Sequence, residues 1–256
     1  MATCIKSNCN EPGDYLFRST PFCSDHYCAK VHSTFCKAFP KRLPKGSLTH
    51  LDQGLPSDAY CIKVLQRQAI WSETSITASF VTISSTLLPY MHISPLSDYF
   101  ITLVSAANEH GCICLSDTSE RIAILALWLM FTGGGHLLPL LAQKFTNMTE
   151  TCTVSRPTSR LSSNDLLSVL KLKELPYNNN MSADELGLSS HKIYRKFQRF
   201  LHTSLKEDSL AYCRNIMSTI DFLTTNAEVS CALCCASCSV SICPSCEKWF
   251  ENLNQS

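Results

Sequence analysis

Two groups of cysteines lie near the two ends of this 256-residue chain, and their spacing is that of metal ligands. The C-terminal group contains two Cys-x2-Cys pairs separated by eight residues, which can bring four thiolates around one tetrahedral ion. Soft thiolates favour zinc, and a structural site needs no open position. The sequence therefore predicts a C-terminal zinc site. Its four predicted ligands are Cys231, Cys234, Cys243 and Cys246.

Two further cysteines leave the C-terminal ligand set open. Cys235 or Cys238 could replace Cys234, or help to hold a second ion. An iron–sulfur cluster uses the same ligand type and is the main metal alternative. Without a metal, the same cysteines would be buried or palmitoylated thiols.

The N-terminal group has the spacing Cys-x4-Cys-x13-Cys-x2-His. The first pair spans a turn, and the second pair stands at the entry to a helix predicted over residues 27–39. Three cysteines and one histidine form a closed zinc site, so the sequence predicts a second zinc ion here. The predicted ligands are Cys4, Cys9, Cys23 and His26.

The predicted helix 27–39 carries a stripe of further donors on one face. Cys28, His32 and Cys36 follow one another at intervals of four residues. They could add a ligand, but packing of these side chains against the metal module is the favoured interpretation.

The N-terminal segment CIKSNCN…PFCSDHYCAKVH resembles the opening of cysteine-rich regulatory proteins of plant RNA viruses, such as the tobravirus cysteine-rich protein. The resemblance covers about 36 of the 256 residues. It implies a zinc-binding suppressor of RNA silencing. It carries over to the four N-terminal ligands alone.

Residues 181–203 predict a helix-turn-helix whose second helix is basic and aromatic. Gly187 would form the tight turn, and a following serine would cap the second helix. Such a helix could place its cations on nucleic-acid phosphates. The alternative is a surface helix with solvated cations and aromatic residues packed inward. The predicted contacts are Lys192, Arg195, Lys196 and Arg199.

Composition limits the remaining possibilities. Hydrophobic residues make up 45% of the chain, which indicates a folded protein, and the formal net charge of +1 leaves nucleic-acid binding to a local patch. The N-terminus lacks the apolar segment of a signal peptide, which favours an intracellular protein, cytoplasmic or nuclear, over a disulfide-linked one.

Catalytic motifs are missing from the sequence. HExxH, GxSxG and a phosphate-cradling glycine loop are all absent, and the glycines at 133–135 predict a turn. The chain is therefore expected not to be an enzyme and to have no small-molecule substrate.

Residues 122–143 form an uncharged run between Arg121 and Lys144. Its length would suffice for a membrane span, which needs roughly 20 apolar residues. Glycines, His136 and Pro139 interrupt it, so two packed helices are favoured over a membrane tether.

The expected fold class is mainly α, with a helical central domain flanked by an N-terminal Cys3His and a C-terminal Cys4 zinc module. Within the middle, helices are predicted at 61–72, 164–175, 182–203 and 207–224, and residues 75–88 are ambiguous between helix and strand. The expected divisions are 1–36, a basic linker 37–60, the helical domain 61–226 with a candidate boundary at 147–163, and 227–256.

Together these features predict a zinc-binding regulatory protein of viral type, with two zinc ions. It would contact RNA or DNA through the basic helix, in transcription or RNA silencing. The alternative is a zinc-dependent adaptor that binds a host or partner protein, membrane-tethered if residues 122–143 span a bilayer.

Overall fold

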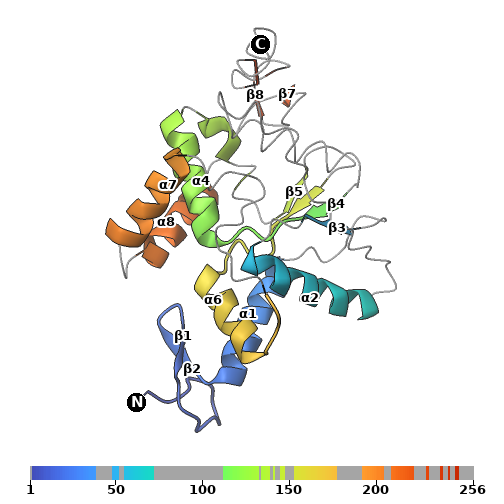
Figure 1. Ribbon diagram of the computed structural model, residues 1–256, viewed down its shortest axis with the longest axis vertical. Helices are drawn as coiled ribbons and strands as arrows, with labels where there is room; N and C mark the ends of the chain where they lie inside the picture. The colour runs from blue at the N-terminus through green and yellow to red at the C-terminus, as the bar shows by residue number, and fades with distance from the viewer. Residues whose placement is uncertain are drawn as a thin grey trace.

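The computed structural model in Figure 1 shows the arrangement of the chain. The structure describes residues 2–38, 48–51, 55–71, 112–132, 134–138, 141, 145–147, 153–177, 192–204, 209–221, 229–230, 237–238, 242 and 246–247.

The N-terminal module consists of a short hairpin and one helix. Strands β1 (Tyr15–Phe17) and β2 (Thr20–Phe22) pair antiparallel, with Phe17 opposite Thr20. The two residues of the turn, Arg18 and Ser19, have φ angles of 52° and 65°. Two positive φ angles define a type I′ turn, whose twist suits a two-residue hairpin. Helix α1 (Ser24–Ala38) follows directly.

A four-stranded sheet lies at the centre of the chain, in the order β3-β4-β6-β5. Strands β3 (Leu48–His50), β4 (Cys112–Cys114) and β6 (Thr153–Ser155) are parallel, and β5 (Phe145–Asn147) is antiparallel at one edge. Both β3 and β4 are buried along their whole length, as expected for parallel strands covered on both faces.

A helix follows each parallel strand in the chain. Helix α2 (Pro56–Trp71) comes after β3, α4 (Ser119–Thr132) after β4, and α6 (Ser163–Leu172) after β6. Loops at the carboxyl ends of these three strands therefore lead into the amino ends of three helices. In open parallel sheets, ligands bind at this edge.

Two hydrophobic cores hold the helices in place. In the first, α4 packs against α7 (Lys192–Arg199), a π-helical turn (Phe200–Ser204) and α8 (Ser209–Asp221). Residues 122–129 of α4 are all buried in this core. Figure 1 shows α4, α7 and α8 together on one side of the molecule.

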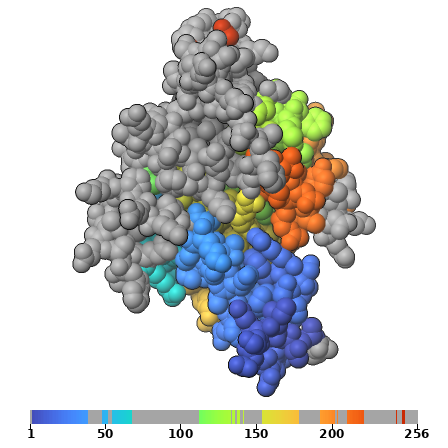
Figure 2. All heavy atoms as spheres, turned by 180° about the vertical axis from the view of Figure 1, so that it is seen from behind, coloured from blue at the N-terminus to red at the C-terminus, as the bar shows by residue number. Residues whose placement is uncertain are grey.

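The second core joins the N-terminal module to the central part of the chain. It contains side chains of α1, α2 and α6 together with Phe17 and Phe22 of the hairpin. The Tyr27 hydroxyl donates to Asp165 at 2.8 Å, and the rings of Phe35 and Tyr60 meet edge to face at 5.6 Å. Figure 2 shows the module as a lobe at one end of the molecule.

The mainly helical character expected from the sequence is confirmed, but the central sheet was missed. Strand β3 lies within the segment 37–60 that was expected to be a linker. The predicted helices 61–72, 164–175 and 207–224 correspond to α2, α6 and α8. The ambiguous segment 75–88 and the first helix of the helix-turn-helix lie outside the described residues.

Asp117 and Glu120 have the spacing of a capping box before α4 but make other contacts. Asp117 accepts from Arg121, and Glu120 accepts from the Ser163 amide. The capping box forms instead at α6, between Ser162 and Asp165. Within the described part of the chain, no helix has both the length and the apolar character needed to span a bilayer.

Candidate functional site

The four predicted N-terminal ligands lie together. Their donor atoms are all within 4.8 Å of one another, and we call Cys4, Cys9, Cys23 and His26 the N-terminal cluster. The Cys23 sulfur is 3.2 Å from His26 Nδ1 and 3.8 Å from the Cys9 sulfur, and the Cys4 sulfur is 3.5 Å from the same nitrogen. Donors this close can bind a common metal atom.

Local backbone contacts explain why these four residues meet. Cys23 follows β2, and His26 lies one turn later in α1. The amide of Cys4 donates to the Glu11 carbonyl, and the amide of Ile5 donates to the Pro21 carbonyl. These bonds hold the Cys4 loop against the hairpin, so that all four donors come from 23 consecutive residues.

The surroundings of the N-terminal cluster shift the pKa values of Cys4 and Cys9 in opposite directions. Burial disfavours the Cys4 thiolate, but hydrogen bonds from the backbone of Cys23 and Lys6 outweigh it and lower the pKa of Cys4 to about 6. The Glu11 backbone lowers the pKa of Cys9, yet burial and the neighbouring sulfurs of Cys4 and Cys23 raise it overall. Neighbouring thiolates repel one another, and a bound cation removes this repulsion.

A second Cys/His group, absent from the sequence predictions, lies inside the molecule. His50 at the end of β3, Cys61 in α2 and Cys114 at the end of β4 have donor atoms within 4.8 Å of one another, and we call them the interior cluster. All three are at most 1% exposed. The sheet register places His50 directly opposite Cys114.

The interior cluster forms a buried ion pair. Hydrogen bonds from Cys61 and His50 lower the pKa of Cys114 to about 6, against the effect of burial. Burial disfavours the His50 imidazolium, but hydrogen bonds with Asp58 and Cys114 raise the pKa of His50 to about 10. His50 Nε2 lies 2.9 Å from Asp58 Oδ1. At neutral pH the cluster is therefore a thiolate and an imidazolium held by a carboxylate.

Further polar groups are buried along the carboxyl edge of the sheet. Asp117 accepts from Arg121 Nε at 2.9 Å, and its other oxygen lies 3.4 Å from Arg156 Nε. Ser116 donates to Asp58. Among the described residues, the hydroxyls of Ser155 and Ser159 have no hydrogen-bond partner. Buried polar atoms without partners mark places where a ligand or water binds.

The amino ends of the helices at this edge already interact with carboxylates of the chain itself. Asp58 accepts from the Leu55 amide at 2.8 Å, Glu120 from the Ser163 amide at 3.0 Å, and Asp165 from the Ser162 amide at 3.1 Å. Helix amino ends are good phosphate sites because their amides point outward. Here an incoming phosphate would compete with these internal carboxylates, and the small cavity beside Glu120 and Ser163 measures about 150 Å³.

The other predicted site residues are placed as follows. Lys192, Arg195, Lys196 and Arg199 are all exposed on α7. Cys246 is buried in the first core, whereas Cys231, Cys234 and Cys243 lie outside the described residues.

Of the three further donors on α1, Cys28 is buried as expected, Cys36 is partly buried against the second core, and His32 is exposed. Cys28 packs in the second core, and the sulfur of Cys36 lies 3.5 Å from His32 Nε2 on the helix surface. The interior cluster had one sequence signal, the Cys-x-Cys of β4, but the partners of Cys114 are 53 and 64 residues away.

Comparison with known proteins gives a fold relative. No protein-family model matches the sequence, and no curated protein matches it. Among solved structures, the chain is similar to the U34-tRNA thiolase NcsA from Methanococcus maripaludis, described with its [4Fe-4S] cluster. The TM-score is 0.62 at 10% sequence identity, and the match covers 98% of this chain and 96% of that one. At this identity the likeness shows a shared fold.

This match overturns several sequence-based expectations. The resemblance to viral silencing suppressors is wrong, because a short cysteine motif produced it and the whole chain has the fold of a tRNA thiolase. The regulatory zinc-finger function and its adaptor alternative are wrong for the same reason, as is the expectation that the chain is not an enzyme. The zinc assignment is also wrong, because the fold relative holds an iron–sulfur cluster, which uses the same cysteine ligands. RNA as a partner is consistent with the match.

Proposed function

We propose that this chain acts in the thiolation of tRNA and holds an iron–sulfur cluster on its N-terminal cysteines. The observation that carries the proposal is the match to a tRNA thiolase over nearly the full length of both chains. Because the match extends from end to end, the N-terminal module is part of the common architecture. Because the two sequences are only 10% identical, the activity is tested by the experiments below.

The donor chemistry of the N-terminal cluster fits an iron–sulfur centre. Three of its four donors are cysteine sulfurs, and His26 offers an imidazole, which also serves as a ligand in some iron–sulfur centres. Cys4, Cys9, Cys23 and His26 would hold the group. When bound, it would supply iron sites for electron or sulfur chemistry.

The residues of the chain have separate tasks under this proposal. The hydrogen bonds that lower the pKa of Cys4 keep a thiolate ready for iron at neutral pH. The interior cluster ties β3, α2 and β4 together beside the carboxyl edge, where the hydroxyls of Ser155 and Ser159 are buried without a hydrogen-bond partner among the described residues. Under this proposal the N-terminal cluster binds the metal, and the interior cluster positions the edge of the sheet.

The cofactor is tested by anaerobic purification of the full chain followed by analysis of iron, acid-labile sulfide and zinc. We expect iron and sulfide together, both lost in Cys4→Ser/Cys9→Ser and retained in Cys36→Ser. Stoichiometric zinc without sulfide would overturn the cofactor proposal.

The activity is tested in cells that naturally express the chain. We expect that its deletion removes a thiolated nucleoside at U34 of tRNA, as measured by mass spectrometry of tRNA digests. Reintroduction of the wild-type chain should restore the nucleoside, and Cys4→Ser/Cys9→Ser should not. Unchanged thiolation in the deletion strain would refute the proposed function.

A further inference from the structure

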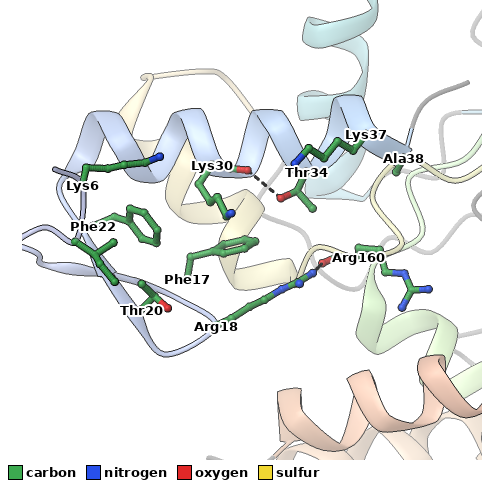
Figure 3. A pocket seen from close by; sticks show the side chains of 11 residues that line it. Lys6, Phe17, Arg18, Thr20, Phe22, Lys30, Thr34, Lys37, Ala38 and Arg160 are labelled. Atoms are coloured by element: carbon green, nitrogen blue, oxygen red, sulfur yellow. Dashed lines mark hydrogen bonds between the residues drawn. The ribbon is translucent and has the colours of Figure 1, made fainter. Parts of the chain in front are cut away.

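A basic cavity lies between the β1–β2 hairpin, α1 and the loop before α6 (Figure 3). Its volume is about 720 Å³, within the range of roughly 300–1,000 Å³ typical of small-ligand sites. No carboxylate is among the residues that line it in the described structure. The five cationic residues that line the cavity are Lys6, Arg18, Lys30, Lys37 and Arg160.

This local concentration of positive charge lies in a chain whose formal net charge is only +1. Burial lowers the pKa of Arg18, and the nearby cations Arg214 and Arg160 lower it further, against an opposing effect of Asp165. Cations gathered without balancing carboxylates attract anions to the cavity. A bound anion would relieve the repulsion between the guanidinium groups.

The fold fixes the positions of the cations. Lys30, Thr34 and Lys37 lie on one face of α1 at helical spacing, and both lysines are exposed. Arg18 stands in the turn with positive φ, a conformation that non-glycine residues rarely adopt. Its guanidinium donates to the Arg160 carbonyl at 3.3 Å, which joins the hairpin to a loop 142 residues further along the chain.

Aromatic rings form the floor of the cavity and orient the cations. Phe17 and Phe22 are buried there. The Arg18 guanidinium carbon lies 5.3 Å and the Lys30 ammonium 6.0 Å from the centre of the Phe17 ring. Cation–π contacts hold charged groups without using their N–H donors. Those donors therefore stay available to a ligand.

We propose that this cavity binds the phosphate backbone of tRNA, with α1 and the hairpin supplying the contacts. The inference rests on the proposed function for the identity of the RNA. Two features favour RNA over an acidic protein: the side chains of Lys6, Arg18, Lys30 and Lys37 line a cavity large enough for a nucleotide unit, and the fold relative is a tRNA thiolase. At the carboxyl edge, internal carboxylates already accept from the amides at the helix amino ends, so this cavity is the better phosphate site.

The test uses the full chain and fluorescently labelled tRNA in an anisotropy titration at several KCl concentrations. In Lys30→Gln/Lys37→Gln we expect the Kd to rise about tenfold, and the slope of log Kd against log salt to fall by about 1.5 to 2, since two phosphate contacts are lost. The matched control Lys63→Gln/Lys171→Gln removes two exposed cations elsewhere and should bind like the wild type. Unchanged iron content and circular dichroism establish that the variants are folded.

Two outcomes would overturn the cavity proposal alone. In the first, wild-type protein binds tRNA, Lys30→Gln/Lys37→Gln binds equally well, and Lys192→Gln/Lys196→Gln on α7 loses binding. In the second, polyglutamate competes as effectively as tRNA, which indicates an acidic protein partner. Failure of the wild-type chain to bind tRNA under any salt condition would overturn the proposed function as well.

Discussion

The N-terminal cluster and the interior cluster are made of the same residue types but differ in how the chain assembles them. The first draws its four donors from residues 4–26, and two of its members, Cys9 and His26, are only half-buried. The second joins a strand end, a helix and a second strand end across 64 residues, and all three members are almost fully buried. The solvent exposure of the donor atoms determines whether each cluster can take up a metal ion from solution.

Access to solvent separates the two clusters chemically. A half-buried set of donors can take up a metal from solution, and a bound metal satisfies all of its thiolates at once. A buried thiolate beside an imidazolium is already neutralised, and Asp58 adds a third charge to the pair. We therefore infer that the N-terminal cluster binds metal and that the interior cluster stabilises the fold.

The largest expected effect comes from removing two N-terminal ligands. Cys4→Ser/Cys9→Ser should lose bound iron completely, and the hairpin should become sensitive to limited proteolysis, because a small module depends on its metal for stability. Asp58→Asn, which alters the interior cluster, should keep its full iron content. Loss of iron from Asp58→Asn would mean that the metal lies in the interior.

Next in size is the effect of Asp58→Asn on the free energy of unfolding, measured by denaturant titration. Removing the Asp58 carboxylate takes away the hydrogen-bond partner of His50 Nε2 and the acceptor of the Leu55 amide, and we expect a loss of about 3 kcal/mol. The control Asp25→Asn changes an exposed ion pair with Lys173, 3.6 Å away, and should cost less than about 1 kcal/mol. Equal losses in the two variants would contradict the buried ion pair.

A third prediction concerns the pH dependence of stability. The pKa of Cys114 falls from 9.0 to about 6, and that of His50 rises from 6.5 to about 10. Between pH 6.5 and 9, the unfolded chain holds one proton on this pair, on the sulfur, and the folded chain holds one, on the imidazole. Because the numbers of bound protons are equal, the pair adds no pH dependence to stability in this window.

Cys114→Ser should remove that balance. With Asp58 still raising the pKa of His50, the folded variant binds a proton that the unfolded chain lacks above pH 6.5. Its stability should therefore fall as pH rises from 6.5 toward 9, by up to about 1.4 kcal/mol per pH unit. Burial raises the pKa of Cys112 in the same strand to about 12, so the control Cys112→Ser should show no such slope. A flat profile for both variants would count against a charged His50.

The smallest expected effect lies in the turn beside the N-terminal cluster. Ser19 has a φ of 65°, so Ser19→Gly should stabilise the hairpin by about 0.5 kcal/mol, since glycine adopts this conformation without a steric penalty. Hydrogen exchange of hairpin amides measures the change. Faster exchange in the variant would show that the serine side chain contributes more than the strain costs.

Much of the local structure could be predicted from the sequence, because it depends on residues close together in the chain. Helical periodicity located α2, α6 and α8 within a few residues, and the Cys-x4-Cys and Cys-x2-His spacings identified residues whose donor atoms lie together. Spacing alone does not distinguish a zinc site from an iron–sulfur centre, because both use thiolate ligands.

The central sheet was missed because its strands are only three residues long, too short to show alternation. The parallel strand order was missed with it, because no glycine-rich or nucleophile motif in the sequence marks the strand ends. The loop that leads from β4 into α4 reads Leu115-Ser116-Asp117-Thr118, without glycine, and its function depends on which strands lie beside it.

The sequence by itself determined the helical segments and the grouping of the four N-terminal donor residues, since these depend on spacing within a short stretch of chain. The tertiary structure alone decided the interior cluster and the basic cavity. His50, Cys61 and Cys114 meet because parallel pairing sets β3 beside β4, and Arg18 meets Arg160 because the hairpin packs near the loop before α6. Such contacts join residues 50 to 150 positions apart, and no local pattern in the chain records them.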